Sequence, residues 1–212
     1  MWEWRIFFKE DFSNEFELSS EFEKKINNNP LEIRTDYYYD LSRPDIGLKE
    51  RGSSQGKVFR PILELKVLLQ KKQWGAELWK KFINYPINKS IDPDKGLSIY
   101  DIIEILQYER DKIPMGVKIE PIISNLEKKT QNRIPVKKER VQMNDVYRFN
   151  HSRSKFKLER TKVHILGENW QTICIESPNS ELLRDFVRNQ VLNIPDNVMG
   201  GYPEFILTQR KE

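Results

Sequence analysis

Apolar and charged side chains alternate repeatedly along the chain, and this pattern restricts it to a sheet with two unlike faces. Segment 2–8 reads Trp-Glu-Trp-Arg-Ile-Phe-Phe, and segment 61–67 reads Pro-Ile-Leu-Glu-Leu-Lys-Val. Because side chains at every second position of a strand share a face, each such segment has an apolar side for packing and a charged side. The pattern predicts an antiparallel sheet in which charges of both signs line one surface.

The period-two pattern predicts eight strands, and four-residue steps predict helices between and after them. The expected strands cover residues 2–8, 33–40, 48–51, 57–69, 136–143, 145–150, 155–166 and 170–176. Expected helices cover 74–82, from the apolar stripe Trp74, Leu78 and Phe82; 98–106, capped by Ser98 and Asp101; 119–129; and 181–192. Segment 13–25 is either a short acidic helix or an irregular loop.

This order of elements predicts one α+β domain over residues 1–212, with a helical insert at about 70–132. Two architectures are compatible with the charged strand faces. One is a sheet with a solvated face, which is common in antiparallel proteins. The other is a closed or nearly closed eight-stranded barrel with charges inside and helices packed outside. Lys and Arg recur in nearly every strand and amphipathic helices are available as cover, so we favour the barrel.

Composition narrows the classes of function. The chain has 36 Lys and Arg against 32 Asp and Glu, and a net charge of +4 is too small to indicate nucleic-acid binding. Segment 133–162 is more basic, but its charges alternate within strands and do not form a basic helix, which argues against direct nucleic-acid binding. No apolar run is long enough to span a membrane, and no signal peptide is evident. With a single Cys174, the expected location is the reducing cytoplasm.

The charged face predicts a phosphate-binding chemistry. Lys and Arg at low effective dielectric attract phosphate oxygens, and Arg can bind two of them at once. Carboxylates beside them would hold Mg²⁺ or Mn²⁺, which bridges phosphate oxygens and polarises the terminal phosphorus.

Eight short motifs occur in an order and spacing typical of one superfamily. They lie at Met1–Arg5, Tyr37–Asp40, Leu48–Arg51, Leu63–Lys66, Lys138–Arg140, Arg160–Gly167, Cys174–Glu176 and Gly201–Phe205. Together they resemble the CYTH, or triphosphate tunnel metalloenzyme, superfamily, which includes thiamine triphosphatases, tripolyphosphatases and one class of adenylate cyclase. The resemblance extends from residue 1 to about 206.

The resemblance implies a set of site residues. Metal ligands would be Glu3, Glu64 and Glu176, with Glu3 and Glu176 catalytic. Phosphate-binding residues would be Arg5, Lys49, Arg51, Lys66, Lys138 and Arg140. The implied activity is Mg²⁺- or Mn²⁺-dependent hydrolysis of tripolyphosphate, thiamine triphosphate or a nucleoside triphosphate.

The chain departs from the superfamily's pattern at three acidic positions. Met1, Thr161 and Cys174 stand where carboxylates are expected. Glu64, or Glu159 if its strand is turned the other way, could replace part of the lost charge. The departures support an alternative function: a catalytically degenerate protein that binds a polyanion, or a structural subunit that contacts a protein partner through the helical insert.

Overall fold

The computed structural model describes residues 1–52, 61–88, 91–92, 95–114, 116–128, 133–149 and 152–210. Its strands are β1 Trp2–Lys9, β2 Glu17–Leu18, β3 Leu31–Tyr39, β4 Ile46–Arg51, β5 Ile62–Lys71, β6 Glu77–Pro86, β7 Arg133–Phe149, β8 Ser152–Ile165, β9 Glu168–Ser177, β10 Val191–Asn193 and β11 Val198–Met199. Its α-helices are α1 Ser20–Asn27, α2 Ile99–Tyr108, α3 Ile119–Lys128, α4 Ser180–Gln190 and α5 Tyr202–Gln209. Two 3₁₀ helices cover Glu10–Glu15 and Arg110–Lys112.

Eight of these strands pair in a closed ring. The order of hydrogen-bonded neighbours is β1-β6-β5-β4-β3-β7-β8-β9, and β9 pairs back with β1. The short strand β11 adds to β1, and β2 pairs separately with β10. The strands pair antiparallel; β1 and β9, for example, pair from Trp2 opposite Ser177 to Lys9 opposite Trp170. The expected fold class, an α+β protein with an eight-stranded antiparallel barrel, is confirmed.

The helix expected over residues 74–82 is wrong, because β6 occupies this part of the chain. A spacing of four residues is also a multiple of two, so the stripe Trp74, Leu78 and Phe82 fits a strand as well as a helix. No capping residue begins a helix here. Instead, Gly75 turns the chain between β5 and β6 with a φ of +95°, a conformation that glycine adopts without strain.

The two strands expected over 136–143 and 145–150 are one strand, β7, which runs through the predicted turn at Asn144 and Asp145. The predicted number of eight strands agrees with the barrel only because these two errors cancel: one strand, β6, is missing from the prediction, and another, β7, is counted twice. Residues 57–60 and residue 150, at the ends of two expected strands, lie outside the described residues. Segment 13–25 contains both a helix, α1, and irregular structure.

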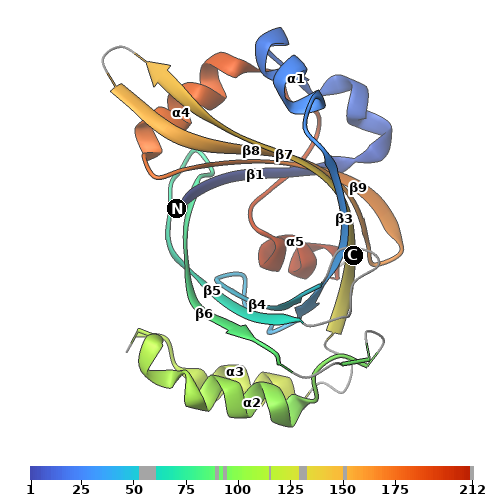
Figure 1. Cartoon of the computed structure of the whole chain (residues 1–212), viewed down its shortest axis with the longest axis vertical. Helices are drawn as coiled ribbons and strands as arrows, with labels where there is room; N and C mark the ends of the chain where they lie inside the picture. The colour runs from blue at the N-terminus through green and yellow to red at the C-terminus, as the bar shows by residue number, and fades with distance from the viewer. Residues whose placement is uncertain are drawn as a thin grey trace. The chain divides into compact units, whose positions relative to one another are not determined.

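The chain forms two compact units. Unit 1 comprises residues 1–33, 68–79 and 137–201. Its hydrophobic core lies between the apolar face of β1, β8 and β9 and the helices α1 and α4 (Figure 1). Trp4, Ile6 and Phe8 supply this face from β1, while Phe22 of α1 and Phe186 of α4 stack edge to face at 4.9 Å. The opposite face of β1 carries Glu3 and Arg5, as the alternation predicts.

Unit 2 comprises residues 34–67, 80–136 and 202–212. Helices α2 and α3 cover the apolar face of β4, β5 and β6 (Figure 1), where Leu48, Leu63 and Ile83 are fully buried. Helix α2 begins at a capping box: Asp101 N–H donates to Ser98 Oγ at 3.1 Å, and Ser98 N–H donates to Asp101 Oδ2 at 3.3 Å. The predicted helix start is confirmed.

Helix α5 differs from the other helices because it packs on the charged face of unit 2. Tyr202 stacks on Tyr38 at 5.0 Å, and a Cβ at Gly47 would lie 3.2 Å from Pro203. Tyr38 lies opposite Lys49 in the sheet, and Gly47 precedes Lys49 by two residues, so all three share one face.

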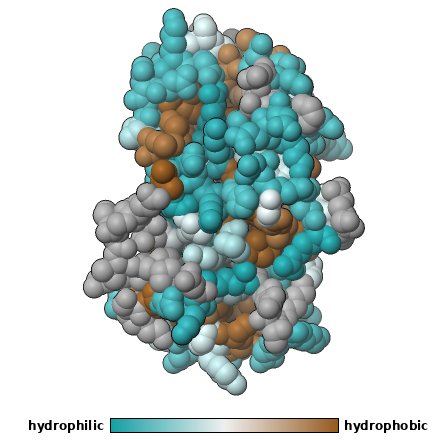
Figure 2. Space-filling view, turned by 90° about the vertical axis from the view of Figure 1, so that its right-hand side faces the viewer, coloured by the Kyte–Doolittle hydropathy of each residue, from teal (hydrophilic) through white to brown (hydrophobic). Residues whose placement is uncertain are grey.

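The surface agrees with the modest apolar content of the sequence. On the side drawn in Figure 2, hydrophilic residues cover most of the coloured surface, and hydrophobic residues appear as separate patches. None of the helices in the described ranges has the length and apolarity needed to cross a membrane.

Candidate functional site

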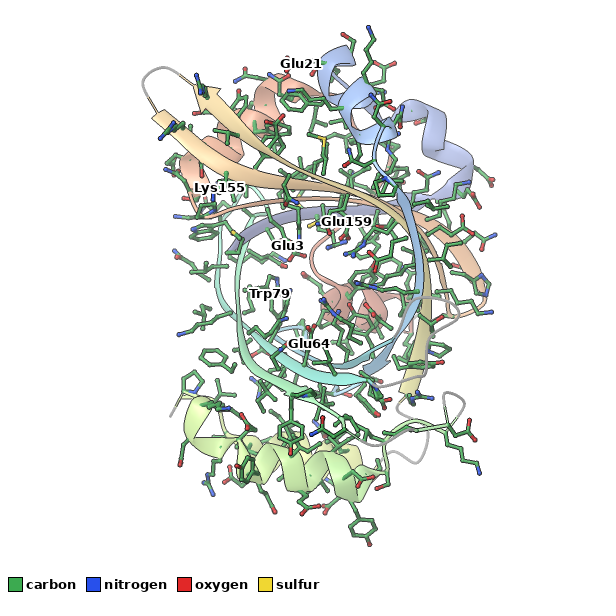
Figure 3. All side chains as sticks on the ribbon, viewed as in Figure 1. Glu3, Glu21, Glu64, Trp79, Lys155 and Glu159 are labelled. Atoms are coloured by element: carbon green, nitrogen blue, oxygen red, sulfur yellow. The ribbon has the colours of Figure 1, made fainter. Side chains whose placement is uncertain are left out.

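Charged side chains gather on the unit 1 sheet face that lies away from α1 and α4, where Figure 3 labels Glu3 and Glu159. The strand register brings them there: Glu3 lies opposite Glu176, and Arg5 and Glu159 both lie opposite Cys174. We call this group the unit 1 cluster. It comprises Glu3, Arg5, Glu32, Lys138, Arg140, Lys157, Glu159 and Glu176. The cluster contains four cations and four carboxylates.

Glu159 is the centre of the unit 1 cluster. Its Oε1 accepts from Arg5 Nη1 at 3.3 Å, and its Oε2 accepts from Arg140 Nη1 at 2.9 Å. Arg140 also contacts Glu32. Burial alone would raise the pKa of Glu159, but Arg5, Arg140, Lys138 and Lys157 outweigh burial and hold the pKa well below its usual range. Glu159 is therefore an ionised, buried carboxylate that fixes two guanidinium groups.

Among the described residues of unit 1, one group of side chains places possible metal-ligand atoms close together: Glu3, Cys174 and Glu176. A carboxylate oxygen of each Glu and the Cys174 Sγ all lie within 4.8 Å of one another. Glu3 accepts from Arg5 Nε at 2.9 Å, and Glu176 pairs with Lys157 at 2.6 Å. Burial, with the neighbouring carboxylates Glu3 and Glu176, raises the pKa of the Cys174 thiol well above its usual value although Arg5 opposes this. The thiol is therefore protonated at neutral pH.

Unit 2 has a second group of charges, most of them buried, which we call the unit 2 cluster: Arg34, Asp36, Lys49, Arg51, Glu64 and Lys81. Glu64 of β5, labelled in Figure 3, is its centre and is 1% exposed. Lys81 contacts it at 2.6 Å, Arg51 at 3.2 Å and Lys49 at 3.6 Å. Burial would raise the pKa of Glu64, but these three cations outweigh it and lower the pKa.

Asp36 is the other carboxylate of the unit 2 cluster. It is fully buried and contacts Lys49 at 3.1 Å and Arg34 at 3.3 Å. Glu64 is thus contacted by three cations of its own unit, and one of these, Lys49, also contacts Asp36. Lys66 lies on the same face as Glu64, is half-buried, and has no ion pair among the residues that the structure describes. Lys66 is therefore a further cation on the face that carries Glu64.

The remaining neighbours of this face are polar or aromatic. Lys49 Nζ lies 5.2 Å from the centre of the Tyr38 ring and donates to Tyr38 Oη at 3.5 Å. Tyr38 in turn stacks on Tyr202 of α5. The charged face of unit 2 is therefore bordered by α5, and Arg210, which directly follows α5, pairs with Asp40.

Several residues expected at the site do lie together within a unit. Glu3 approaches Glu176, Arg5 and Arg140 meet at Glu159, and Lys49 and Arg51 meet at Glu64 with Lys66 on the same face. Lys138 is buried and lies close enough to Glu159 to lower its pKa. Glu64, expected as a metal ligand, is instead held by three cations of its own unit. The binding and catalytic roles of all these residues stay predictions.

Sequence reasoning missed Lys81, Asp36, Arg34 and Lys157 as members of the clusters. Lys81 was hidden because its segment was assigned to a helix; once 77–86 is a strand, alternation puts Lys81 and Lys80 on opposite faces. Asp36 and Arg34 follow from the period-two pattern of β3, which places them on the face of Tyr38.

The three positions at which the resemblance implies a carboxylate that this chain lacks have different surroundings. Met1 is 58% exposed, and its amino group donates to the carbonyl of Trp79 at 3.2 Å. Thr161 is fully buried on the face of β8 that carries Glu159, and its Oγ1 has no hydrogen-bond partner in the described part of the chain. Cys174 is fully buried beside Glu159. Glu159 lies on the same face as Cys174, so it supplies one of the carboxylates of this region.

No protein-family model matches the chain, and no curated protein matches it. Among solved structures, the chain is similar to a crystal structure from Bacillus halodurans described as a "putative adenylate cyclase". The two are 11% identical, the match covers 92% of this chain and 93% of the other, and the TM-score is 0.39. At this TM-score we draw no conclusion from the likeness.

Proposed function

We propose that the chain binds a triphosphate or longer polyphosphate anion through the charged face of unit 2. One observation carries the proposal: a carboxylate that is 1% exposed, Glu64, is shared by Lys49, Arg51 and Lys81, and Lys66 lies on the same face. Arg51 and Lys81 are 35% and 34% exposed, so a ligand can reach them, and several cations around one carboxylate favour an anionic ligand.

The chemistry of these cations suits phosphate. Arg51 offers a planar fork that can bind two phosphate oxygens, while Lys49, Lys66 and Lys81 act as point charges. Glu64 would keep the cations in place before the ligand arrives, which lowers the cost of ordering them on binding. In the unit 1 cluster Arg5 and Arg140 pair with Glu159 and Lys138 lies near it, so these cations would contact a ligand only by loosening their hold on Glu159. Membership of the CYTH superfamily would account for both clusters and is part of this proposal.

Metal-dependent triphosphate hydrolysis is the second candidate, since Glu3, Cys174 and Glu176 approach one point. These side chains do not fit Mg²⁺ or Mn²⁺ well. Such cations prefer several oxygen ligands, whereas this group supplies two carboxylates that already pair with Arg5 and Lys157, and a thiol whose pKa is raised. We therefore derive no catalytic step through a metal, and binding is the function that the residues support best.

The test is calorimetric and thermal-shift titration of the full chain with tripolyphosphate in the presence of EDTA. We expect saturable binding and an increase in melting temperature, with weaker effects of pyrophosphate and orthophosphate. Sodium sulfate at matched ionic strength controls for screening. If tripolyphosphate behaves like matched sulfate, the chain does not bind polyphosphate and only a structural role remains.

A pair of adjacent residues supplies a matched control for the binding face. Lys81→Gln removes a cation that contacts Glu64, and we expect it to weaken tripolyphosphate binding about tenfold, the effect typical of losing one charged hydrogen bond. Lys80→Gln removes the same charge from the exposed, opposite face of β6 and should leave the affinity within about twofold. Equal effects of the two variants would contradict the assignment of the face.

Phosphate release from tripolyphosphate, thiamine triphosphate and ATP, with Mg²⁺ or Mn²⁺ added, tests the second candidate. We expect no turnover above background. Turnover that Glu3→Gln or Glu176→Gln abolishes would instead establish hydrolysis at the unit 1 cluster.

A further inference from the structure

A cavity of about 390 Å³ lies in unit 2 between the end of β6 and helix α2, on the side of the sheet away from the charged face. Its lining includes Tyr85, Ile87, Leu97, Asp101, Glu104 and Tyr108. The volume falls within the range of small-molecule sites. All the lining residues belong to unit 2 and to the described part of the chain.

The base of the cavity is apolar and one side is aromatic. Ile87 and Leu97 are each 5% exposed and belong to the hydrophobic core under α2. The rings of Tyr85 and Tyr108 meet edge to face, with centroids 6.3 Å apart and planes inclined at 78°. Tyr108 is nevertheless 77% exposed, so most of its ring is available to a ligand.

Two carboxylates of α2 complete the lining. Asp101 accepts hydrogen bonds from the backbone and hydroxyl of Ser98, which fixes its position. Glu104 is exposed and has no ion pair with any residue that the structure describes. None of the described residues that line the cavity is Lys, Arg or His. The cavity therefore combines an apolar base, aromatic ring faces and the carboxylate of Glu104, which no described cation pairs with.

We propose that this cavity binds a small organic ammonium ion, with its apolar body on Ile87 and Leu97 and its cationic group near Glu104 and the tyrosine rings. A cation over an aromatic face is attracted by the ring quadrupole. The Glu104 carboxylate adds a charge interaction that a neutral ligand would lack. This site is separate from the polyphosphate site proposed above and has the opposite charge preference.

The probe is 2-phenylethylammonium, and its neutral counterpart of similar shape is 2-phenylethanol. Titration of the full chain, followed by ligand-observed NMR, should give a dissociation constant of about 1 mM or tighter for the ammonium ion, a value reasonable for so small a ligand. The alcohol should bind at least about fivefold more weakly, because it loses the cation–π and charge terms. Equal affinities, or no binding of the ammonium ion, would overturn the proposal.

Two substitutions locate the site, and each has a matched control on the same layer of helices. Glu104→Gln and Tyr108→Leu alter exposed lining residues and should each weaken ammonium binding about fivefold. Glu127→Gln on α3 and Tyr100→Leu on α2 alter equally exposed side chains that do not line the cavity, and both should bind as the unchanged chain does. If the control variants weaken binding as much as the lining variants, the ammonium ion binds elsewhere. Circular dichroism of each variant confirms that the fold is retained.

Discussion

Removing the carboxylate of Glu64 should make the protein less stable without ligand and more responsive to polyphosphate. Glu64→Gln keeps the size of the side chain but deletes the charge that Lys49, Arg51 and Lys81 share. Lys49, Arg51 and Lys81 would then lose the carboxylate that they share. An added polyanion can supply the missing negative charge, whereas a structural ion pair with no ligand site could not be restored in this way.

The magnitude follows from the burial of the partners. Breaking a buried ion pair by removing one partner costs about 3–5 kcal/mol. Arg51 and Lys81 are 35% and 34% exposed, so water can solvate them in part, and the lower end of this range applies. For a chain of this length, about 3 kcal/mol corresponds to a fall in melting temperature of roughly 6–12 °C.

Thermal melts with and without tripolyphosphate in EDTA measure both effects. We expect tripolyphosphate to raise the melting temperature of Glu64→Gln by more degrees than it raises that of the unchanged chain. Glu50→Gln is the control: Glu50 is fully buried in the same unit on the opposite face of β4, where it pairs with Arg133. It should lose stability without enhanced recovery. An unchanged melting temperature for Glu64→Gln, or identical recovery in the two variants, would refute the reasoning.

Three further outcomes are expected. The folded-state pKa of Glu159 is lowered, so the stability that its ionised form contributes is fully present above the unfolded pKa of about 4.3 and is lost as pH falls from there through the folded pKa. Glu159→Gln should therefore cost about 3–5 kcal/mol at pH 7 and flatten the acid limb of a plot of stability against pH. A plot for the variant that runs parallel to that of the unchanged chain would contradict this. Cys174 should not react with a thiol reagent at pH 8 until urea unfolds the chain, because it is buried and its pKa is raised; stoichiometric labelling of the folded protein would disprove this. Gly75→Ala should cost more than about 1 kcal/mol in urea melts, since φ is +95° and the added Cβ would lie 1.7 Å from the Met199 sulfur, while Gly116→Ala, with open space around it, should be neutral.

Alternation in the sequence predicts an antiparallel sheet with one apolar and one charged face because alternation is a local property, whereas the closure of the sheet by β9 and β1 is seen only in the fold. The pattern of residues 2–8 and 61–67 fixes which side chains share a face, and the register of β1 against β9 and of β4 against β5 agrees with it. The same locality explains the errors. A four-residue step fits both a strand and a helix, which is why the pattern predicts a helix where β6 lies. The Asn144-Asp145 pair predicts a turn, although β7 continues through it.

The candidate site was determined only in part by sequence. Alternation identified Glu3, Arg5, Lys49 and Glu64 as residues of the charged face. It could not show which charges would be neutralised, because ion pairs join residues far apart in the chain, such as Arg5 and Glu159. The tertiary structure shows that Arg5 and Arg140 meet at Glu159 and that Glu64 is held by three cations of its own unit. The reason is electrostatic: the properties of a buried charge depend on the groups within a few ångströms of it, and only the fold brings those groups together.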